Sequence, residues 1–548
     1  MSQELEEREA RMQKTTFLSM ALVVSLGAAV GQAREGRLLV NLPDESSATA
    51  EAAAVAVQFA TREASRVLGL SAREGLALRT ADHDGAGVVH VRFDTRVQDV
   101  RVVGGEVIVH VDAASRRIVG LSNFHRRVNV EDPTPRVSEG DAVGMAWALM
   151  APASAPAEKP QTELVFYPSK GSYRLAWMVR MFVENEVEEP RAEAFVIDAK
   201  TGEVLDRWDD LRTGKPGGST PPPGSGSPAV GTAKTLYLGQ LSIDTEFYSS
   251  ANLYGMVDRV RGNAYTTDMN NRQTGSGTLF TDADNTWGNF TNSDRATAGT
   301  DAHLGMAFTW DYYKNVHGRN GIYNDGVGAF SRVHYGRNYN NAFWSDSCKC
   351  MTYGDGDGSV LSPLVSLDVA GHEMSHGVTS ATANLQYSGE SGGLNESTSD
   401  IFGTAVEFYA NNPNDPPDWW IGETVYTPSK PGDALRYMDD PKKDGRSVDH
   451  YSLYTNGMDV HYSSGIANNF FYLLANGGTN RTSGISVTGI GLAKAERIWY
   501  VALTGYMTST TNFSQARQAT IQAATQLFGA SSVEVQRVKD AWTAVGVY

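Results

Sequence analysis

The stretch TGKPGGSTPPPGSGSP, at residues 213–228, divides the chain into two parts. It contains no large apolar residue that a folded core would bury, so we interpret it as an exposed linker. The chain has 548 residues, more than a single hydrophobic core accommodates, so roughly two to four domains are expected. An exposed segment of this composition is also a preferred site of proteolytic cleavage. We therefore interpret residues 34–212 and 229–548 as separately folded parts.

The N-terminus resembles a secretory signal peptide. Residues 15–33, TTFLSMALVVSLGAAVGQA, are an apolar run that follows three basic residues and ends in small residues, which predicts cleavage near Ala33. The alternative is a membrane anchor, but the apolar core of about 16 residues is shorter than the ~20 that span a bilayer. Met12 gives a start of more usual length. We predict that residues 1–33 are a signal peptide and that the protein is secreted to the extracellular space, with no membrane contact after cleavage.

Composition narrows the classes of function. The formal net charge of −16 argues against nucleic acid and anionic membrane surfaces as the main partners. The chain has only two cysteines, so disulfide bonds cannot be what holds the fold together. A hydrophobic content of 41% with 20% charged residues is typical of an ordinary globular protein. These values indicate a soluble exported protein and are compatible with bound calcium.

The two parts differ in predicted secondary structure. Residues 34–212 contain short segments of alternating polar and apolar residues, which indicate an antiparallel sheet, and two helical segments that pack on it. Residues 229–364 are rich in Gly, Asn, Asp and Tyr and predict a twisted, turn-dense β region. Helical patterns dominate residues 365–548. The predicted fold class is α+β, with a β-rich lobe followed by an α-helical lobe.

The sequence His-Glu-Met-Ser-His at residues 372–376 is the strongest candidate for a functional site. On a helix, His372 and His376 lie one turn apart, which brings both imidazoles to one side with Cβ atoms about 5–6 Å apart. This spacing suits two ligands of one metal ion, with Glu373 beside the ion as a base. The alternative is two ordinary histidines on a helix surface, and a third ligand is needed to exclude it.

A downstream glutamate supplies that third ligand. Glu396 lies 20 residues after His376, at the start of a second helical pattern. Two neutral imidazoles and one carboxylate leave a zinc coordination position open for water, as a catalytic site requires. Asp400, one turn after Glu396, is placed to accept the other ring N–H of a zinc histidine.

Further acids lie on the same two helical patterns. Asp368 stands one turn before His372, and Glu407 about three turns after Glu396. If the helices run antiparallel, these acids meet at one end. Buried unpaired carboxylates are costly, so a hard cation such as calcium is the natural counter-charge. Each acid taken alone is more often part of a solvated helix face.

These residues carry a resemblance to the thermolysin family of zinc neutral proteases, closest in motif to its pseudolysin and vibriolysin branch. The shared motifs cover residues 229–548 almost end to end: NNAFW, YGDGDG, DVAGHEMSHGVT, GGLNESTSDIFG, GRSVDHYS and MDVHYSSGIANNFFYLL. Two histidines and one glutamate are the zinc ligands of thermolysin itself, so this ligand set belongs to the resemblance. The implied fold has a β-rich lobe at 229–364 and a helical lobe at 365–548, with zinc in the cleft. The resemblance makes residues 34–212 a propeptide that assists folding and inhibits until it is removed by cleavage in the linker.

The implied activity is that of a zinc endopeptidase. One zinc would be held by His372, His376 and Glu396, and Glu373 would activate the attacking water. The resemblance assigns donation to the oxyanion to two further residues, His461 and Tyr387, with Asp459 orienting His461. Taken alone, His461 in its aromatic-rich segment is more often a core histidine.

The resemblance also implies substrate contacts. Asn341 and Ala342 match an edge segment that pairs with the substrate backbone, and Arg436 matches an arginine that holds the carbonyl beyond the cleaved bond. The pocket for the residue after that bond is matched by three apolar positions, Val369, Ile421 and Leu435. We expect a preference for a hydrophobic residue there.

Calcium ligands and the cysteines depart from the family pattern. Asp418 and Glu423 match calcium acids, but Trp420 replaces an acid found in relatives with two calcium ions, so we expect one ion there. Thr427 and Asp433 are candidates for another ion. Cys348 and Cys350 are separated by one residue; export favours their oxidation, yet so small a ring would be strained and would stabilise little.

The expected partners are protein or peptide substrates and the chain's own propeptide as an intramolecular inhibitor, with a monomer as the oligomeric state. Two other functions are weighed. A zinc-bearing binding protein that has lost turnover would not need Glu373 and His461, and both are present. An exopeptidase needs a group that captures a chain terminus, and the sequence offers no candidate for it.

Overall fold

The structure is a computed structural model that describes residues 47–548, apart from 130–131, 153–158, 187, 212–225 and 347. The signal peptide predicted at residues 1–33, the alternative start at Met12 and most of the linker therefore lie outside the described residues. Among the residues that are described, no helix has both the length and the apolar character needed to cross a membrane.

The N-terminal part, residues 47–211, is built on an eight-stranded sheet with the order β1-β2-β3-β5-β6-β7-β8, and β4 pairs with β3. Strand β3 pairs with β5 in parallel, and the other neighbours in this sheet are antiparallel. The strands are β1 Glu74–His83, β2 Val88–Val97, β3 Val100–Asp112, β4 Arg117–Asn123, β5 Gln161–Ser169, β6 Ser172–Val183, β7 Arg191–Asp198 and β8 Val204–Asp209.

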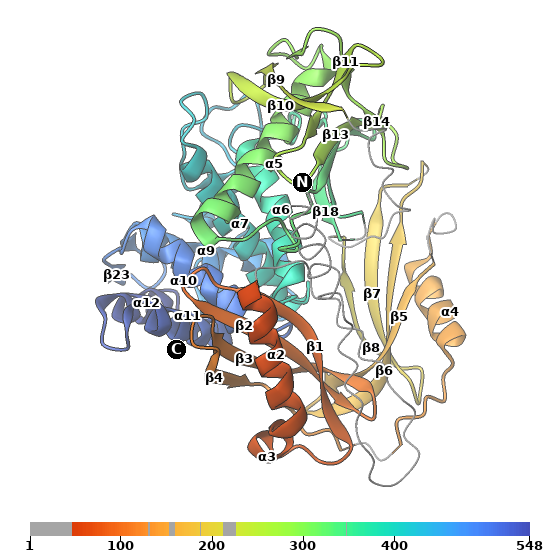
Figure 1. Ribbon diagram of the computed structural model, residues 1–548, viewed down its shortest axis with the longest axis vertical. Coiled ribbons are helices and arrows are strands. Elements are labelled where there is room, and N and C mark those ends of the chain that lie inside the picture. Colours follow the sequence, from red (N-terminus) through yellow and green to blue (C-terminus); the bar gives the residue numbers. More distant parts are fainter. Residues whose placement is uncertain (1–46, 130–131, 153–158, 187, 212–225, 347) are drawn as a thin grey trace, which may run out of the picture. The chain divides into compact units, whose positions relative to one another are not determined.

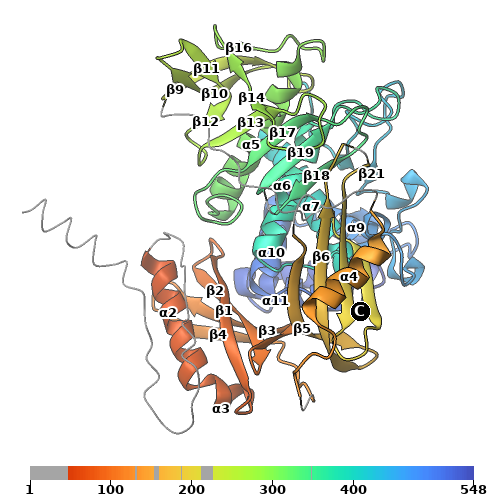
Figure 2. The same cartoon turned by 90° about the vertical axis from the view of Figure 1, so that its right-hand side faces the viewer.

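Helices pack against this sheet at two places. Helix α2, Ser47–Arg62, buries Ala52 and Ala56 against valines of β2 and β3, and the short α3, Ala64–Leu68, follows it (Figure 1). Helix α4, Glu139–Met150, packs against β6 and β7 (Figure 2). The α+β character predicted for this part is confirmed.

The region after the linker contains two sheets. The first has the order β15-β11-β10-β9-β16, and the second has the order β12-β13-β17-β19-β18, with β14 on β13. Strand β18 is thus at an edge of the second sheet. Strand β9 begins at Ser227, so it includes the last two residues of the expected linker. The strands are β9 Ser227–Lys234, β10 Gln240–Tyr248, β11 Leu253–Gly255, β12 Val257–Asp258, β13 Ala264–Asp268, β14 Thr278–Leu279, β15 Thr281–Asp282, β16 Thr286–Trp287, β17 Phe330–Tyr335, β18 Ala342–Ser345 and β19 Cys350–Gly354.

A long helix, α5 at Arg295–His317, also lies in this β-rich region, and the sequence analysis did not predict it. Most of its residues are buried, so no single apolar stripe produces a helical period in the sequence. Its ends did carry signals. Asp294 accepts a hydrogen bond from the backbone N–H of Ala296, and Gly318 follows the last turn in the left-handed conformation, with φ 75°.

The C-terminal region is helical, as predicted. Helices α6, Leu367–Ala381, and α7, Gly389–Ala410, pack closely because glycines face one another: a Cβ added at Gly403 would lie 2.5 Å from the carbonyl oxygen of Asp368. The remaining helices are α8 Val460–Ser463, α9 Gly465–Ala475, α10 Leu492–Gly505, α11 Phe513–Phe528 and α12 Val533–Ala544. Short elements complete the region: β20 Trp420–Ile421, β21 Arg436–Tyr437, β22 Gly478–Thr479, β23 Ser486–Val487, and the 3-10 turns η1 Pro441–Asp444 and η2 Tyr451–Leu453.

Buried polar contacts join the N-terminal part to the region after the linker. Arg319 donates to Asp82 at 2.9 Å, and both side chains are almost fully buried. Glu106 accepts from the backbone N–H of Ser509 at 3.0 Å and pairs with Arg92, whose guanidinium donates to two backbone carbonyls near the end of α10. Removing one partner of such a buried pair leaves an uncompensated charge, so these contacts fix how the two surfaces dock.

A buried histidine pair at this junction predicts a pH effect on stability. The Nδ1 atoms of His90 and His110 are 2.7 Å apart, and the ring of His110 lies 4.9 Å from that of Tyr506. Burial, with the nearby His90 and Arg92, lowers the pKa of His110 to about 3. Between that value and the unfolded pKa of about 6.5, the unfolded chain binds the extra proton, so stability falls as pH falls. At pH 5 we expect a loss of about 2 kcal/mol from His110 relative to pH 7.

Urea unfolding of the precursor at pH 7 and pH 5 measures this loss. The variant His110→Gln cannot titrate, so its unfolding free energy should fall by about 2 kcal/mol less than that of the wild type over the same interval. Equal losses in the two proteins would show that His110 contributes nothing to the acid sensitivity.

Candidate metal centre and substrate cleft

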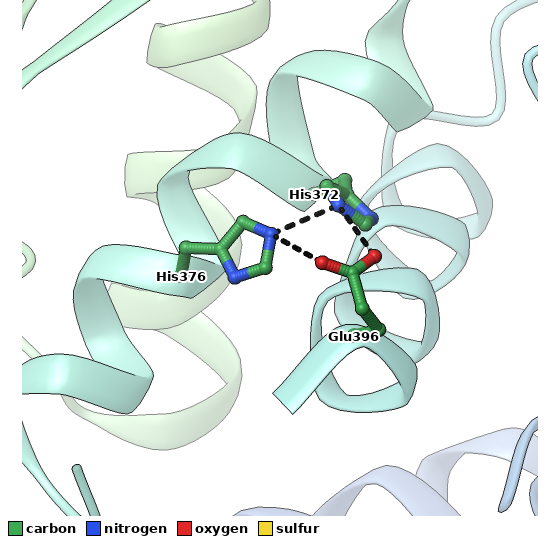
Figure 3. A group of neighbouring side chains, drawn as sticks. All are labelled: His372, His376 and Glu396. Carbon is green, nitrogen blue, oxygen red and sulfur yellow. Dashed lines mark hydrogen bonds and ion pairs between the residues drawn. The ribbon is translucent and has the colours of Figure 1, made fainter. Parts of the chain in front are cut away.

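Three side chains from α6 and α7 converge at one point. His372 Nε2 lies 3.0 Å from His376 Nε2 and 3.6 Å from Glu396 Oε2, and His376 Nε2 lies 3.3 Å from Glu396 Oε1 (Figure 3). All three residues are buried. The helix places the two histidines one turn apart on the side that faces α7, and α7 supplies the carboxylate.

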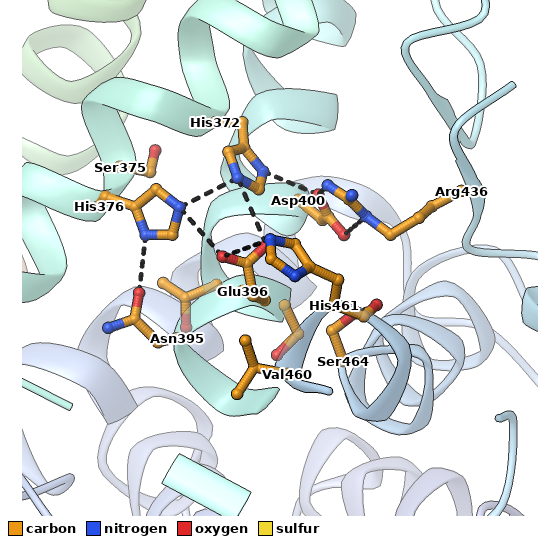
Figure 4. A network of polar contacts seen from close by, with 12 residues as sticks. His372, Ser375, His376, Asn395, Glu396, Asp400, Arg436, Val460, His461 and Ser464 are labelled. Carbon is orange, nitrogen blue, oxygen red and sulfur yellow. Dashed lines mark hydrogen bonds and ion pairs between the residues drawn. The ribbon is translucent and has the colours of Figure 1, made fainter. Parts of the chain in front are cut away.

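The hydrogen bonds behind these residues show which atoms are free to bind a metal. His372 Nδ1 lies 2.8 Å from Asp400 Oδ1, and His376 Nδ1 lies 2.8 Å from Asn395 Oδ1 (Figure 4). The Asn395 amide is oriented by its donation to the carbonyl of Leu385 at 2.9 Å. Because both acceptors require a proton on Nδ1, the two Nε2 atoms present lone pairs to each other. Glu396 Oε2 has no hydrogen-bond partner among the described residues. Converging lone pairs of two imidazoles and a carboxylate fit one zinc ion.

Glu373 lies next to this centre and is buried at the cleft. Burial raises its pKa, and the neighbouring His372 and His376 oppose the rise. Burial alone would raise the pKa of Glu396, but His461 and His376 hold this pKa well below its usual value. The site therefore combines one carboxylate held ionised with another of raised proton affinity, which is the pairing expected of a ligand and a base.

Two hydrogen-bond donors stand across from the three ligands. Tyr387 donates to Glu396 Oε1, and its hydroxyl lies 3.2 Å from His461 Nε2. Asp459 caps α8, and its Oδ1 lies 2.8 Å from His461 Nδ1, so it orients the ring. Burial lowers the pKa of His461, but Glu396 and Asp459 outweigh that effect and raise the pKa above its usual value. Protonated His461 can donate from Nε2 into the cleft, where its side chain is half exposed.

A cavity of about 260 Å³ opens on the centre. Strand β18 forms one wall, and among the described strands it pairs only with β19, so its outer edge can pair with an extended peptide. All six residues predicted to contact substrate line the cavity: Asn341, Ala342, Val369, Ile421, Leu435 and Arg436.

Arg436 is fixed by the same carboxylate that supports a zinc histidine. Its guanidinium donates to Asp400 through Nε at 2.8 Å and Nη2 at 2.6 Å (Figure 4). Asp400 also accepts from Asn468 Nδ2 at 2.8 Å. Burial favours the neutral acid, but Arg436 and His372 hold the pKa of Asp400 well below its usual value. Asp400 is therefore an ionised carboxylate that links the metal centre to the substrate cleft.

The comparisons with known proteins agree with this geometry. Residues 230–380 match the family model "Thermolysin metallopeptidase, catalytic domain", and residues 383–547 match "Thermolysin metallopeptidase, alpha-helical domain". Residues 74–116 match the "Fungalysin/Thermolysin Propeptide Motif". The chain belongs to the thermolysin family. It is thus a zinc metallopeptidase with a propeptide motif, and the expectation drawn from the sequence is confirmed at this level.

Named members of the thermolysin family are similar over most of the chain. The Transglutaminase-activating metalloprotease of Streptomyces mobaraensis is 44% identical over 88% of this chain, which spans 62% of that protein's length. The Thermolysin of Alicyclobacillus acidocaldarius is 42% identical, covering 88% of this chain and 87% of that one. The solved precursor of Protealysin from Serratia proteamaculans has 32% identity and a TM-score of 0.43, covering 52% of this chain and 87% of that one. Placement in the pseudolysin and vibriolysin branch stays a prediction.

A second cluster of acids lies where α7 meets the loop before β20. Oxygens of Glu407, Asp415 and Glu423 lie within 4.8 Å of one another, and each residue has a buried oxygen with no hydrogen-bond partner among the described residues. Burial and the repulsion of neighbouring acids, Asp368 first among them, raise the pKa of Glu407 to about 11, of Glu423 to about 10 and of Asp415 to about 7. Carboxylate oxygens converging in this way fit a hard cation such as calcium.

The cluster differs in part from the expected calcium ligands. Asp415 was not among them, whereas Asp418 accepts from the backbone N–H of Trp420 at 2.6 Å and is not part of the trio. Asp368 accepts from the backbone N–H of Gly422. The other expected pair, Thr427 and Asp433, is in direct contact, with Thr427 Oγ1 donating to Asp433 Oδ2 at 2.9 Å.

Two further features near the cleft were not predicted from the sequence. Asp209 and Leu211, at the end of the N-terminal part, line the same cavity as the metal centre. Asn395 orients His376, a role that its place one residue before Glu396 could have suggested. Cys348 and Cys350, whose oxidation export favours, form a disulfide bond just after β18.

Proposed function

We propose that this protein is a secreted zinc endopeptidase, made as an inactive precursor, that cleaves peptide bonds before a hydrophobic residue. The observation that supports it most is the convergence of His372 Nε2, His376 Nε2 and Glu396 Oε2, with both Nδ1 atoms already bonded to acceptors. Glu373 stands beside this centre and lines the same cavity as the edge strand β18.

The residues of the cleft divide the chemistry among them. His372, His376 and Glu396 would hold zinc, which would supply a Lewis acid that lowers the pKa of water and polarises the peptide carbonyl. Glu373 takes the proton of the attacking water and passes it to the leaving amine. Tyr387 and His461 donate hydrogen bonds to the oxyanion that forms from the carbonyl, and such donors each contribute about 10²–10³ in rate.

The substrate would lie along β18. Asn341 and Ala342 present backbone groups of an edge strand to an extended peptide, and Arg436 donates to a substrate carbonyl. An apolar pocket lined by Val369, Ile421 and Leu435 would receive the side chain that follows the cleaved bond.

The N-terminal part, proposed as a propeptide at residues 34–212, would inhibit by filling the cleft. Asp209 and Leu211 lie where a peptide would bind, so the uncleaved chain blocks its own site. Cleavage in the linker, residues 213–228, would precede release. We propose an extracellular monomer in which 229–364 and 365–548 form the two lobes of the active enzyme.

Calcium would stabilise the helical lobe. We propose one ion at Glu407, Asp415 and Glu423, with Asp368 and Asp418 beside it. A further ion at Thr427 and Asp433 is supported by their contact alone.

Hydrolysis of casein by the linker-cleaved protein tests the proposal. We expect peptide-length products, an activity that a zinc chelator abolishes and zinc restores, and one zinc per chain by metal analysis. Single amino acids as products would indicate an exopeptidase, and one zinc without turnover would indicate a binding protein.

A further inference from the structure

We infer that the active enzyme has a subsite for an acidic side chain of the substrate, formed by Arg332 and Tyr335, at a position before the cleaved bond. The inference rests on the proposed endopeptidase function and adds a substrate class to it. In the precursor this subsite is filled by Glu184 of the N-terminal part.

The sheet connects this subsite to the cleft. Phe343 on β18 is paired with Thr352 on β19, and Thr352 is paired with Arg332 on β17. Directly paired residues on neighbouring strands put their side chains on the same face, so these three form a row that runs inward from the edge strand. Phe343 lines the cavity at the metal centre. Arg332 therefore lies on the same face of the sheet as Phe343, two strands inward from the edge at which a bound peptide would pair.

The guanidinium of Arg332 is held in a fixed orientation by groups of its own lobe. Nε donates to Thr352 Oγ1 at 3.0 Å, and Nη1 donates to the carbonyl of Gly275 at 2.9 Å. The group also lies over the rings of Tyr335 and Phe343, at 5.5 and 6.0 Å from their centroids. Because the guanidinium is already oriented, binding a ligand does not cost the conformational entropy of ordering this side chain.

The remaining donors of this site point to Glu184. Arg332 Nη2 and the Tyr335 hydroxyl each lie 3.1 Å from Glu184 Oε1, and the Glu184 side chain is buried. Among the described residues, Glu184 is the carboxylate that forms an ion pair with Arg332. Release of the N-terminal part leaves Arg332 with no acidic partner among the described residues of the catalytic lobes. A cation next to aromatic rings with two donors left vacant is a receptor for a carboxylate.

A second side chain of the N-terminal part continues the same surface toward the metal. Leu211 packs against the cluster of Met269, Tyr335, Tyr339 and Phe343, and it also lines the cavity. The N-terminal part thus places a leucine near the metal centre and a glutamate farther along the face. The apolar pocket of Val369 and Ile421 belongs to a different cluster, so this surface would serve residues on the other side of the cleaved bond.

Paired peptides test the subsite on the linker-cleaved enzyme after the N-terminal part has been removed. Each pair carries Glu or Gln at one of the positions two to five before the cleaved bond and is otherwise identical. We expect kcat/KM to be at least about tenfold higher for Glu at one position, the range of one hydrogen bond to a charged group. The difference should reside mainly in KM, and it should shrink as salt is raised.

Variants separate the subsite from general damage. Arg332→Met should bring the Glu/Gln ratio of kcat/KM to within about twofold of one. Arg481→Met, an exposed arginine between β22 and β23, should keep the wild-type ratio. If Arg332→Met does not fold, the test is the salt dependence of the wild-type Glu/Gln ratio of kcat/KM, which should shrink as salt is raised. Equal rates on Glu and Gln peptides at every position would overturn the subsite alone, whereas failure to cleave any peptide would overturn the proposed function.

Discussion

Replacing Glu373 by glutamine is expected to lower kcat/KM on a peptide substrate by about 10³-fold or more, with one zinc per chain retained. Glutamine keeps the shape of the side chain, but its amide cannot take a proton from water. General base catalysis contributes about 10²–10⁴ in rate. Glu373 is a buried carboxylate beside the three ligands, and it is not bonded to the ligand atoms that face the metal. Stopped assays on linker-cleaved protein, with metal analysis of the same sample, measure both quantities.

The matched control for this variant is Glu390→Gln. Glu390 lies in the first turn of α7 and hydrogen-bonds Tyr451 and the backbone of Phe513, away from the three ligands. Its amide variant should keep activity within about twofold. Retained activity in Glu373→Gln, with zinc still bound, would rule out Glu373 as the base.

Removal of calcium is expected to produce the second largest effect, a loss of stability in the helical lobe. If free calcium stands a thousandfold above its Kd, binding adds about 4 kcal/mol to the free energy of unfolding. The reason is the trio of Glu407, Asp415 and Glu423, whose unpartnered oxygens are costly to bury without a cation. Thermal unfolding with and without a calcium chelator should differ in Tm by roughly 10 °C.

Asp415→Asn locates this effect. The variant should require at least about tenfold more calcium to reach the Tm of the wild type, because one of three converging charges is gone. Asp540→Asn, on α12 and partly exposed, is the matched control and should titrate like the wild type. An unchanged calcium titration in Asp415→Asn would place the ion elsewhere.

The zinc centre was predictable because its information is local. His372 and His376 are one helical turn apart, and Glu396 with Asp400 repeat that spacing on the next helix, so the two pairs could be recognised in the sequence, while the resemblance to the family supplied the ligand set. Docking of the two helices was the remaining unknown, and their glycine-lined contact decided it. Asn395 was not predicted because its amide side chain is uncharged, so no pattern of charges in the sequence distinguishes it.

The rest of the site depends on contacts between segments far apart in the sequence. Asp415 joins Glu407 only through the path of a loop, and Leu211 reaches the cavity only because a whole sheet is docked beside it. The pairing of Arg332 with Glu184 is of the same kind. Helix α5 was missed for a different reason, since burial on all sides removes the amphipathic period on which helix prediction relies.

Both chain ends that flank the linker are held in sheets. Strand β8 pairs with β7 up to Asp209, and β9 pairs with β10 and β16 from Ser227 onward. Cleavage of the linker leaves both strands in their sheets. It therefore changes only the covalent connection between the catalytic lobes and the segment in which Leu211 and its neighbours line the cavity. While the linker is intact, its length sets the effective concentration of Leu211 and its neighbours at the cavity. After cleavage, the same contact forms between two separate chains. Inhibition of the linker-cleaved protein then depends on its concentration, and a concentrated sample stays inactive longer than a dilute one.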